Sequence, residues 1–454
     1  NTAREGGEDM IDAQGVAFAG LPGVVLGFNR DIAWGATTTG YDVTDVYLEQ
    51  ITGSCTDGDV VSGTVTFDGA EVAIGFFDET IPVAGTTEPL NVRFPMVPHH
   101  GAFIPGSCAP VLDGGGTPIA GQFTAISVRY TGDEISNELA YFTGLLTAST
   151  VEEARTAQDA FRVGSQNFIV IDRSSISWST KSRIPVRDPR AMTFAIDADD
   201  VPSGYCPHMV LPGTGEYEWT GDLDSRFVPH DTNPGRHWIA TANQDNVGVT
   251  DDGNPCNDGH YIGAGFAVGF RHGRIVERLD ALTAAGGITS DDMVALQHET
   301  TSQTGQGMRD GIVAALDHAL GDTSDDPALA AVVAAAGGTT DLQDVRDRLA
   351  AWSFATPHGV GATDAGVIAD SVATTIFNVL VAHLAQLTFD DEEDRIGRGM
   401  GSSETARLLE WMLDTPAEQM ALPLYAFRAS YTGVTDWNDS VLWDDLDTDT
   451  VVET

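Results

Sequence analysis

The sequence predicts an α+β protein in which a strand-rich part is followed by a helical part. Hydrophobic alternation and short Gly/Pro-containing turns dominate residues 1–268, with one embedded helix, whereas apolar residues recur at the helical period over residues 269–454. The length of 454 residues suits one very large domain or two to three ordinary ones. Internal repeats and Ser/Gly-rich linkers are missing from the sequence, so we expect the two parts to follow one another directly.

The strand-rich part contains three predicted hairpins. We expect them between residues 24–28 and 32–39, between 64–67 and 70–73, and between 168–171 and 176–179. The second has the two-residue turn Asp68-Gly69, which favours a tight connection. Residues 188–237 are dense in Pro, Gly and Asp, and we interpret this stretch as loops that wrap a functional site.

Helix-terminus signals place the predicted helices. Ser149 and Glu152 form a capping-box pattern for a helix that ends near residue 162, and Thr340 with Gln343 form another. Thr289-Ser290 and Pro327 mark two further N-termini. Additional helices are predicted over residues 271–282, 370–387 and 404–413, and the acidic tail after residue 443 is expected to fray.

The charge balance is extreme. The chain has 67 Asp and Glu against 23 Lys and Arg, a net charge of −44, and Lys181 as its one lysine. Its 42% hydrophobic residues argue against disorder. A dispersed acidic surface is typical of proteins that stay soluble in high salt, so we expect a halophilic, haloarchaeal-type source. Nucleic acid is excluded as a partner because no basic patch could meet phosphates.

The cysteines leave two alternatives. Cys55, Cys108, Cys206 and Cys256 include no CxxC pair, so a zinc site is not expected. They form either two disulfides, 55–108 and 206–256, or four buried thiols. Disulfides would favour an exported, extracellular or cell-surface protein over a cytoplasmic one. The uninterrupted apolar runs are too short for a membrane span, and no signal peptide is visible.

Several separated blocks occur in a characteristic order. They read GLPGVVLGFNRDIAWGATTTGYDVTDVY from residue 20, then SQNFIVIDR, LPGTGEYEWTGDL, NPGRHWIATANQDN and GFRHGRIVERL. In residues and order these blocks resemble the penicillin acylase family of N-terminal-nucleophile amidohydrolases. The resemblance covers roughly residues 15 to 300. It implies an Ntn-hydrolase-like αββα sandwich, incomplete here, with an additional helical portion.

The resemblance also implies roles for particular residues. In such enzymes an N-terminal serine attacks an N-acyl amide and its own α-amine acts as the base. The match places the two oxyanion donors on the backbone N–H of Thr38 and the side chain of Asn243. A bracing arginine falls on Arg271, or else on the neighbouring His272. A structural Ca²⁺ would bind Asp42, the carbonyl of Thr44, Asp45 and Asp258.

His99-His100 is the remaining conspicuous pair. We interpret it as loop packing, because adjacent side chains on an extended segment point to opposite faces.

The two ends depart from the family pattern. Only about twenty residues precede the PGVVLG block and the first is Asn1, whereas the family's nucleophile lies a few tens of residues upstream. The returning strands of the family also lack a counterpart after Asp447. We therefore expect a chain truncated at both ends, inactive alone, that belongs to a self-processed precursor with a separate small N-terminal chain.

Three functions are consistent with the residues. The first is an amidohydrolase acting on small N-acyl amides, either acylated β-lactams, as in antibiotic biosynthesis, or acyl-homoserine lactones. The second is a non-catalytic, calcium-stabilised binding domain that kept the acylase fold. The third, a secreted β-rich adhesin, fits the acidity but leaves the ordered blocks unexplained.

Overall fold

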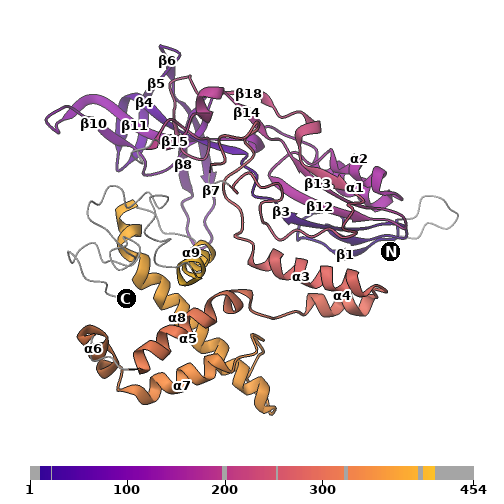
Figure 1. The fold of residues 1–454 in the computed structure, drawn as a ribbon. Coiled ribbons are helices and arrows are strands. Elements are labelled where there is room, and N and C mark those ends of the chain that lie inside the picture. The colour runs from indigo at the N-terminus through magenta and orange to yellow at the C-terminus, as the bar shows by residue number, and fades with distance from the viewer. Residues whose placement is uncertain are drawn as a thin grey trace. The chain divides into compact units, whose positions relative to one another are not determined.

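The computed structural model describes residues 11–21, 23–196, 202–251, 254–321, 326–396 and 402–414. Strands and helices are mixed, which confirms the α+β prediction (Figure 1). The chain divides into two compact units, Asn1–Asp197 with Val201–Phe266, and Ala198–Asp200 with Ala267–Thr454. The predicted acidic tail and the N-terminal Asn1 lie outside the described residues.

A six-stranded antiparallel sheet in the first unit carries the residues of the longest sequence block. Its strand order is β1 (Gln14–Val16), β2 (Leu26–Phe28), β3 (Ala33–Thr38), β12 (Ser165–Ile171), β13 (Ile176–Ser182) and β19 (His230–Thr232). The pairs β2–β3 and β12–β13 are two of the three predicted hairpins, so both predictions are confirmed. Strand β3 lies beside β12, which joins two blocks that are far apart in the sequence.

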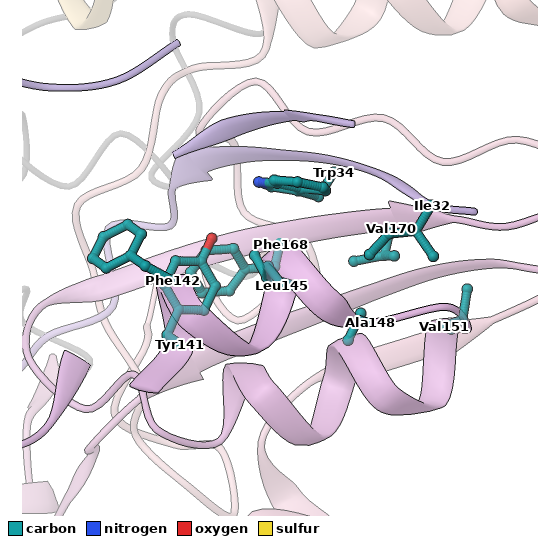
Figure 2. Close-up of a cluster of buried hydrophobic side chains, with 10 residues drawn as sticks. Ile32, Trp34, Tyr141, Phe142, Leu145, Ala148, Val151, Phe168 and Val170 are labelled. Atoms are coloured by element: carbon teal, nitrogen blue, oxygen red, sulfur yellow. The ribbon is translucent and has the colours of Figure 1, made fainter. Parts of the chain in front are cut away.

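Two helices, α1 (Glu138–Thr147) and α2 (Val151–Gln158), cover one face of this sheet. Figure 2 shows Trp34 and Phe168 from the strands against Tyr141 and Leu145 from α1. Fully burying side chains of this size contributes about 1.5–3 kcal/mol each. The sequence did not predict α1, and it placed the cap of α2 one residue early. The hydroxyl of Thr150, not Ser149, accepts the capping hydrogen bond, from the N–H of Glu153.

A second, nine-stranded sheet completes the regular structure of the first unit. Its main order is β6 (Ala70–Ala73), β5 (Asp59–Phe67), β4 (Thr44–Thr56), β11 (Pro118–Tyr130), β9 (Gly101–Phe103), β8 (Leu90–Val97) and β7 (Gly75–Ile81). Strand β10 (Ala109–Leu112) pairs with β11, and β17 (Val210–Pro212) pairs with β4 in parallel. The β5–β6 hairpin is the third predicted one, and Asp68 and Gly69 both have positive φ in its turn, 49° and 73°.

Both predicted disulfides, Cys55–Cys108 and Cys206–Cys256, are present, so the alternative of four free thiols is wrong. The second disulfide fastens the loop-rich stretch that follows β13. Besides β17 and β19, the described residues of this stretch form further short elements: β14 (Pro185–Arg187), η2 (Pro189–Met192), β15 (Ala195–Ile196), β16 (Pro202–Ser203), β18 (Trp219–Asp222) and η3 (Ser225–Phe227).

The regular elements in the described part of the second unit are helices, with one isolated β-bridge between Thr301 and Ala355. The unit contains α3 (Phe270–Ala285), α4 (Ser290–Gln297), α5 (Gln303–Leu320), α6 (Pro327–Ala335), α7 (Thr339–Ala350), α8 (Ala365–Ile396) and α9 (Ser402–Asp414). Met308, Leu349 and Phe377 are among the residues of its core. Thr289 caps α4 as predicted. The capping box predicted at Thr340 is wrong, because α7 starts after Gly338, which has no side chain to cap the helix.

Residues Ala365–Thr388 of α8 are, by length and composition alone, apolar enough to cross a membrane, which the sequence analysis did not expect. Only 11% of this apolar window is buried inside the structure, although the same helix contributes Ala373 and Phe377 to the core of the second unit. One such helix is weak support for a membrane span.

Candidate active site

Thr38 is the last residue of β3 and its backbone faces away from the neighbouring strand β12. The N–H of the next residue, Thr39, donates to the carbonyl of Ser165 on the β12 side at 3.2 Å. Backbone groups of successive strand residues point to opposite edges, so the N–H and C=O of Thr38 both point to the other edge of β3. On that edge β2 pairs only with Ala33 and Trp34. The N–H of Thr38 therefore points to an edge that β2 does not cover.

Asn243 lies at this same edge. Its side-chain Nδ2 donates to the carbonyl of Thr38 at 2.7 Å, although the two residues are 205 positions apart. The backbone of Asn243 has a φ of 67°, in the left-handed region that asparagine tolerates better than most residues. The structure thus brings together the two residues that the sequence assigned as oxyanion donors.

The loop that carries Asn243 is fastened to the sheet on both sides of that residue. Before it, Thr241 accepts a hydrogen bond from the hydroxyl of Thr37 at 3.0 Å. After it, Asn246 donates to the side chain of the fully buried Asn167 at 2.9 Å. Asn167 also donates to Thr37 at 3.1 Å, so the two anchors form one network.

Further hydrogen bonds fix the loop internally. The Asp245 carboxylate accepts from the N–H groups of Val247, Gly248 and Thr250 at 2.8–3.0 Å. The side chain of Gln244 accepts from the N–H of Ala242 at 2.7 Å. A loop held in this way keeps its donors in place before a substrate binds, which is the condition for electrostatic stabilisation of a transition state.

Asp42 and Asp45, two of the predicted calcium ligands, both contact the side chain of Arg187. The guanidinium of Arg187, only 1% exposed, donates to the fully buried carboxylate of Asp45 at 2.8 and 3.2 Å and to the carbonyl of Asp42 at 3.0 Å. Trp219 donates to the second oxygen of Asp45 at 2.6 Å, and Tyr261 donates to Asp42 at 2.8 Å. Burial raises the pKa of Asp42, against the lowering effect of Arg187.

Gly40 permits a close approach between the backbone beside Asp42 and the segment 261–265. A Cβ at this position, where φ is 82°, would lie 2.6 Å from the carbonyl oxygen of Gly265. Because Gly40 has none, the N–H of Asp42 reaches the carbonyl of Ile262 at 2.7 Å. The segment that contains Tyr261 is thereby held against the end of the sequence block.

As they lie, these residues do not present an open set of oxygen ligands for Ca²⁺. Arg187 already supplies the positive charge beside Asp42 and Asp45, and the Asp42 carboxylate also accepts from the N–H of Thr44 at 3.1 Å. Asp258 is exposed. Within the described part of the chain, no metal-spaced group of three or more acidic, His or Cys side chains includes Asp42, Asp45 or Asp258. The calcium site stays a prediction.

Arg271, the predicted bracing residue, lies in the first turn of α3 and is exposed. It belongs to the second unit, whereas Thr38 and Asn243 belong to the first. Its role and that of the alternative His272 stay predictions.

The His99-His100 pair forms the centre of a second buried cluster. His100 is fully buried, and its ring nitrogens lie 2.6 Å from Glu49 and 2.7 Å from Glu218. Burial by itself would lower the pKa of His100, but the hydrogen bonds with Glu218 and Glu49 outweigh it and raise this pKa. The prediction that the two histidine rings lie on opposite faces is wrong. They lie in a turn, where no alternation applies, and their centroids are 4.4 Å apart.

The sequence predicted no role for three residues that organise these sites. Asn167 and Asn246 anchor the donor loop, and Arg187 neutralises Asp45. Asn167 follows the polar residues Ser165 and Gln166 and precedes the apolar run Phe168–Ile171, so its polarity does not set it apart in the sequence. No sequence pattern pairs Arg187 with Asp45, because 142 residues separate them.

A backbone N–H at a strand end beside a fixed side-chain amide is the donor arrangement that acyl-transfer enzymes use for an oxyanion. The comparison with known families agrees: the chain belongs to the penicillin amidase family, whose model matches residues 4–452.

The chain is similar in sequence to proteins named acyl-homoserine lactone acylases and in structure to a penicillin G acylase. The chain is 31% identical over 231 residues to the acyl-homoserine lactone acylase QuiP of Pseudomonas syringae pv. syringae, covering 51% of this chain and 24% of that protein. It is 28% identical over 291 residues to QuiP of Pseudomonas fluorescens, covering 64% and 31%. The matched stretches therefore span less than a third of these relatives. A thermostable penicillin G acylase from Alcaligenes faecalis aligns with a TM-score of 0.47 and 18% identity, over 71% of this chain and 52% of that one.

Proposed function

We propose that this chain is part of an amidohydrolase that cleaves N-acyl amide bonds, with Thr38 and Asn243 as its oxyanion donors. The observation that carries the proposal is the 2.7 Å hydrogen bond from Asn243 Nδ2 to the Thr38 carbonyl. It holds the amide of Asn243 at the strand edge to which the N–H of Thr38 also points. Membership of the penicillin amidase family supports the reaction class.

In the proposed reaction the nucleophile is the hydroxyl of an N-terminal serine from a part of the precursor that this sequence, whose first residue is Asn1, does not include. Its α-amine takes the hydroxyl proton as the oxygen attacks the acyl carbonyl. The Thr38 N–H and the Asn243 amide stabilise the negative charge that develops on the carbonyl oxygen. The tetrahedral intermediate then expels the amine with the transferred proton, and water hydrolyses the acyl-enzyme to a carboxylic acid.

The names of the relatives guide the choice of substrate. Because they are acyl-homoserine lactone acylases, we propose N-acyl-homoserine lactones as the first substrates to test, with acylated β-lactams second. The sequence alone left acylated β-lactams, acyl-homoserine lactones and other acyl amino compounds open.

The test uses the protein purified from its native host, with its processed N-terminus. Release of homoserine lactone from an N-acyl-homoserine lactone is followed by mass spectrometry for the wild type and for Asn243→Ala. Removing one oxyanion donor lowers kcat by about 10²–10³-fold. Asn233→Ala is the matched control, since Asn233 also has a positive φ, 52°, but lies at the end of β19 away from the donor loop.

Two results would contradict the proposal. An unchanged kcat in Asn243→Ala would show that Asn243 is not an oxyanion donor. No hydrolysis of any N-acyl amide by the processed wild type would favour the non-catalytic binding domain instead.

We also propose that the protein is exported. The two disulfides support this location, because disulfides persist in oxidising compartments. Alkylation of the native protein without reductant, followed by mass spectrometry, would find all four cysteines unmodified; alkylated cysteines would contradict export. A halophilic source and a separate small N-terminal chain stay predictions of the same kind.

A further inference from the structure

A cavity of about 800 Å³ in the first unit is lined by an unusual share of the protein's positive charge. Five of the 23 Lys and Arg residues line it, together with His230, while only two acidic residues do. In the whole chain acidic residues outnumber basic ones by 67 to 23, so the cavity reverses the balance of the surface around it. The five cations are Arg155, Arg162, Lys181, Arg183 and Arg226.

The lining of this cavity includes neither Thr38 nor any residue of the loop that carries Asn243. Ser179, in its wall, bonds Gln158 of α2 at 2.8 Å, so the odd-numbered side chains of β13 face the helices. The next side chain towards the N-terminus, Trp178, faces the opposite way and donates to Asn167, the anchor of the donor loop, at 2.8 Å. The cavity is therefore distinct from the candidate active site.

The carboxylates around the cavity neutralise its cations only in part. Asp159 pairs with Lys181 at 2.5 Å but is 69% exposed, and Glu134, which pairs with Arg183, is 74% exposed. Ion pairs with such exposed partners are weak. Asp222 is shared between Arg162 and Arg183, at 3.4 and 2.8 Å.

Arg155 differs from the other four. Its contact in the described residues is a hydrogen bond to the neutral hydroxyl of Thr232 at 3.2 Å, and no ion pair joins it to a described carboxylate. Arg155 is therefore the lining cation whose charge no described ion pair neutralises.

We propose that this cavity binds a small organic anion with at least two negative charges, either a phosphate ester or a polycarboxylate. Cations from α2, the segment after it, β13 and η3 line the same cavity. Guanidinium groups bind carboxylate and phosphate oxygens in a bidentate manner. The volume is in the range of sites for ligands larger than inorganic phosphate. Phe161, Ile184, Leu223 and Val228 in the wall contact the uncharged part of the ligand.

Binding of two probes, phenyl phosphate and citrate, tests the proposal by titration calorimetry on the full chain. Ionic strength is matched, at the lowest KCl concentration at which circular dichroism shows a folded protein. We expect saturable one-to-one binding of at least one probe, weakened by added KCl. Arg155→Gln and Lys181→Met should each weaken it at least tenfold. Arg93→Gln, an exposed arginine that pairs with Asp78 on the second sheet, should leave it unchanged.

The outcomes of the titrations distinguish the two ligand classes or overturn the proposal. Binding of phenyl phosphate alone supports a phosphate ester, and binding of citrate alone supports a polycarboxylate. Absence of saturable binding for both probes, or equal affinity in wild type and Arg155→Gln, overturns the proposal. Since calorimetry needs no hydrolysis, the result stands apart from the test of the candidate active site.

Discussion

Replacing Arg187 by methionine tests whether the Asp45 cluster is held by an internal cation. Arg187 and Asp45 are 1% and 0% exposed, and the guanidinium makes three contacts of 2.8–3.2 Å with this carboxylate. Methionine fills much of the same volume without charge. It leaves the carboxylate buried, with the Trp219 indole at 2.6 Å as its remaining described donor.

The expected loss is large because a buried charge loses its partner. Breaking a buried ion pair in this way costs about 3–5 kcal/mol of the free energy of unfolding. The double variant Asp45→Asn/Arg187→Met removes both charges and keeps an acceptor for Trp219. We expect it to recover most of the loss, because the cost is an unpaired charge rather than a lost attraction.

Urea unfolding followed by hydrogen exchange and mass spectrometry measures this loss. The method reports peptides of the first and second units separately, which is needed because two units need not unfold together. Arg93→Met, on an exposed pair, is the control, and should not change the midpoint measurably. A loss below about 1 kcal/mol for Arg187→Met, or a double variant as unstable as the summed single variants, would refute the reasoning.

Two further predictions concern the first unit. The pKa of His100 is raised in the folded protein, so its contribution to stability is complete below its unfolded value, about 6.5, and is lost as pH rises through the folded value. The free energy of unfolding should fall over that range in the wild type and stay flatter in His100→Gln; equal slopes would exclude His100 as the cause. The Cys206–Cys256 disulfide closes a separation of 50 residues, so Cys206→Ser/Cys256→Ser should lose about 4 kcal/mol in the chain-entropy account. An unchanged thermal midpoint in that variant would show that the loops around β16 are held by other contacts.

Local patterns in the sequence predicted the three hairpins and most of the helices, but neither α1 nor α5. The hairpins follow from alternation and from turns such as Asp68-Gly69, because the strands on either side of a short turn pair with each other. Thr38 and Asn243 were found through blocks of residues that resemble a family, not through physical spacing. Capping boxes were less reliable: one was displaced by a residue and one was absent, since several Ser, Thr and acidic residues compete near each helix start.

The tertiary structure alone decided which charges meet. Arg187 reaches Asp45 across 142 residues, and His100 reaches Glu218 across 118, and neither pairing has a local pattern. In a chain with 67 acidic residues, the sequence cannot tell which carboxylates are buried and which cations they find. The same holds for the cation-lined cavity, whose arginines come from separate elements. Local structure follows from neighbouring residues, whereas a site's electrostatics follow from distances in space that only the folded chain fixes.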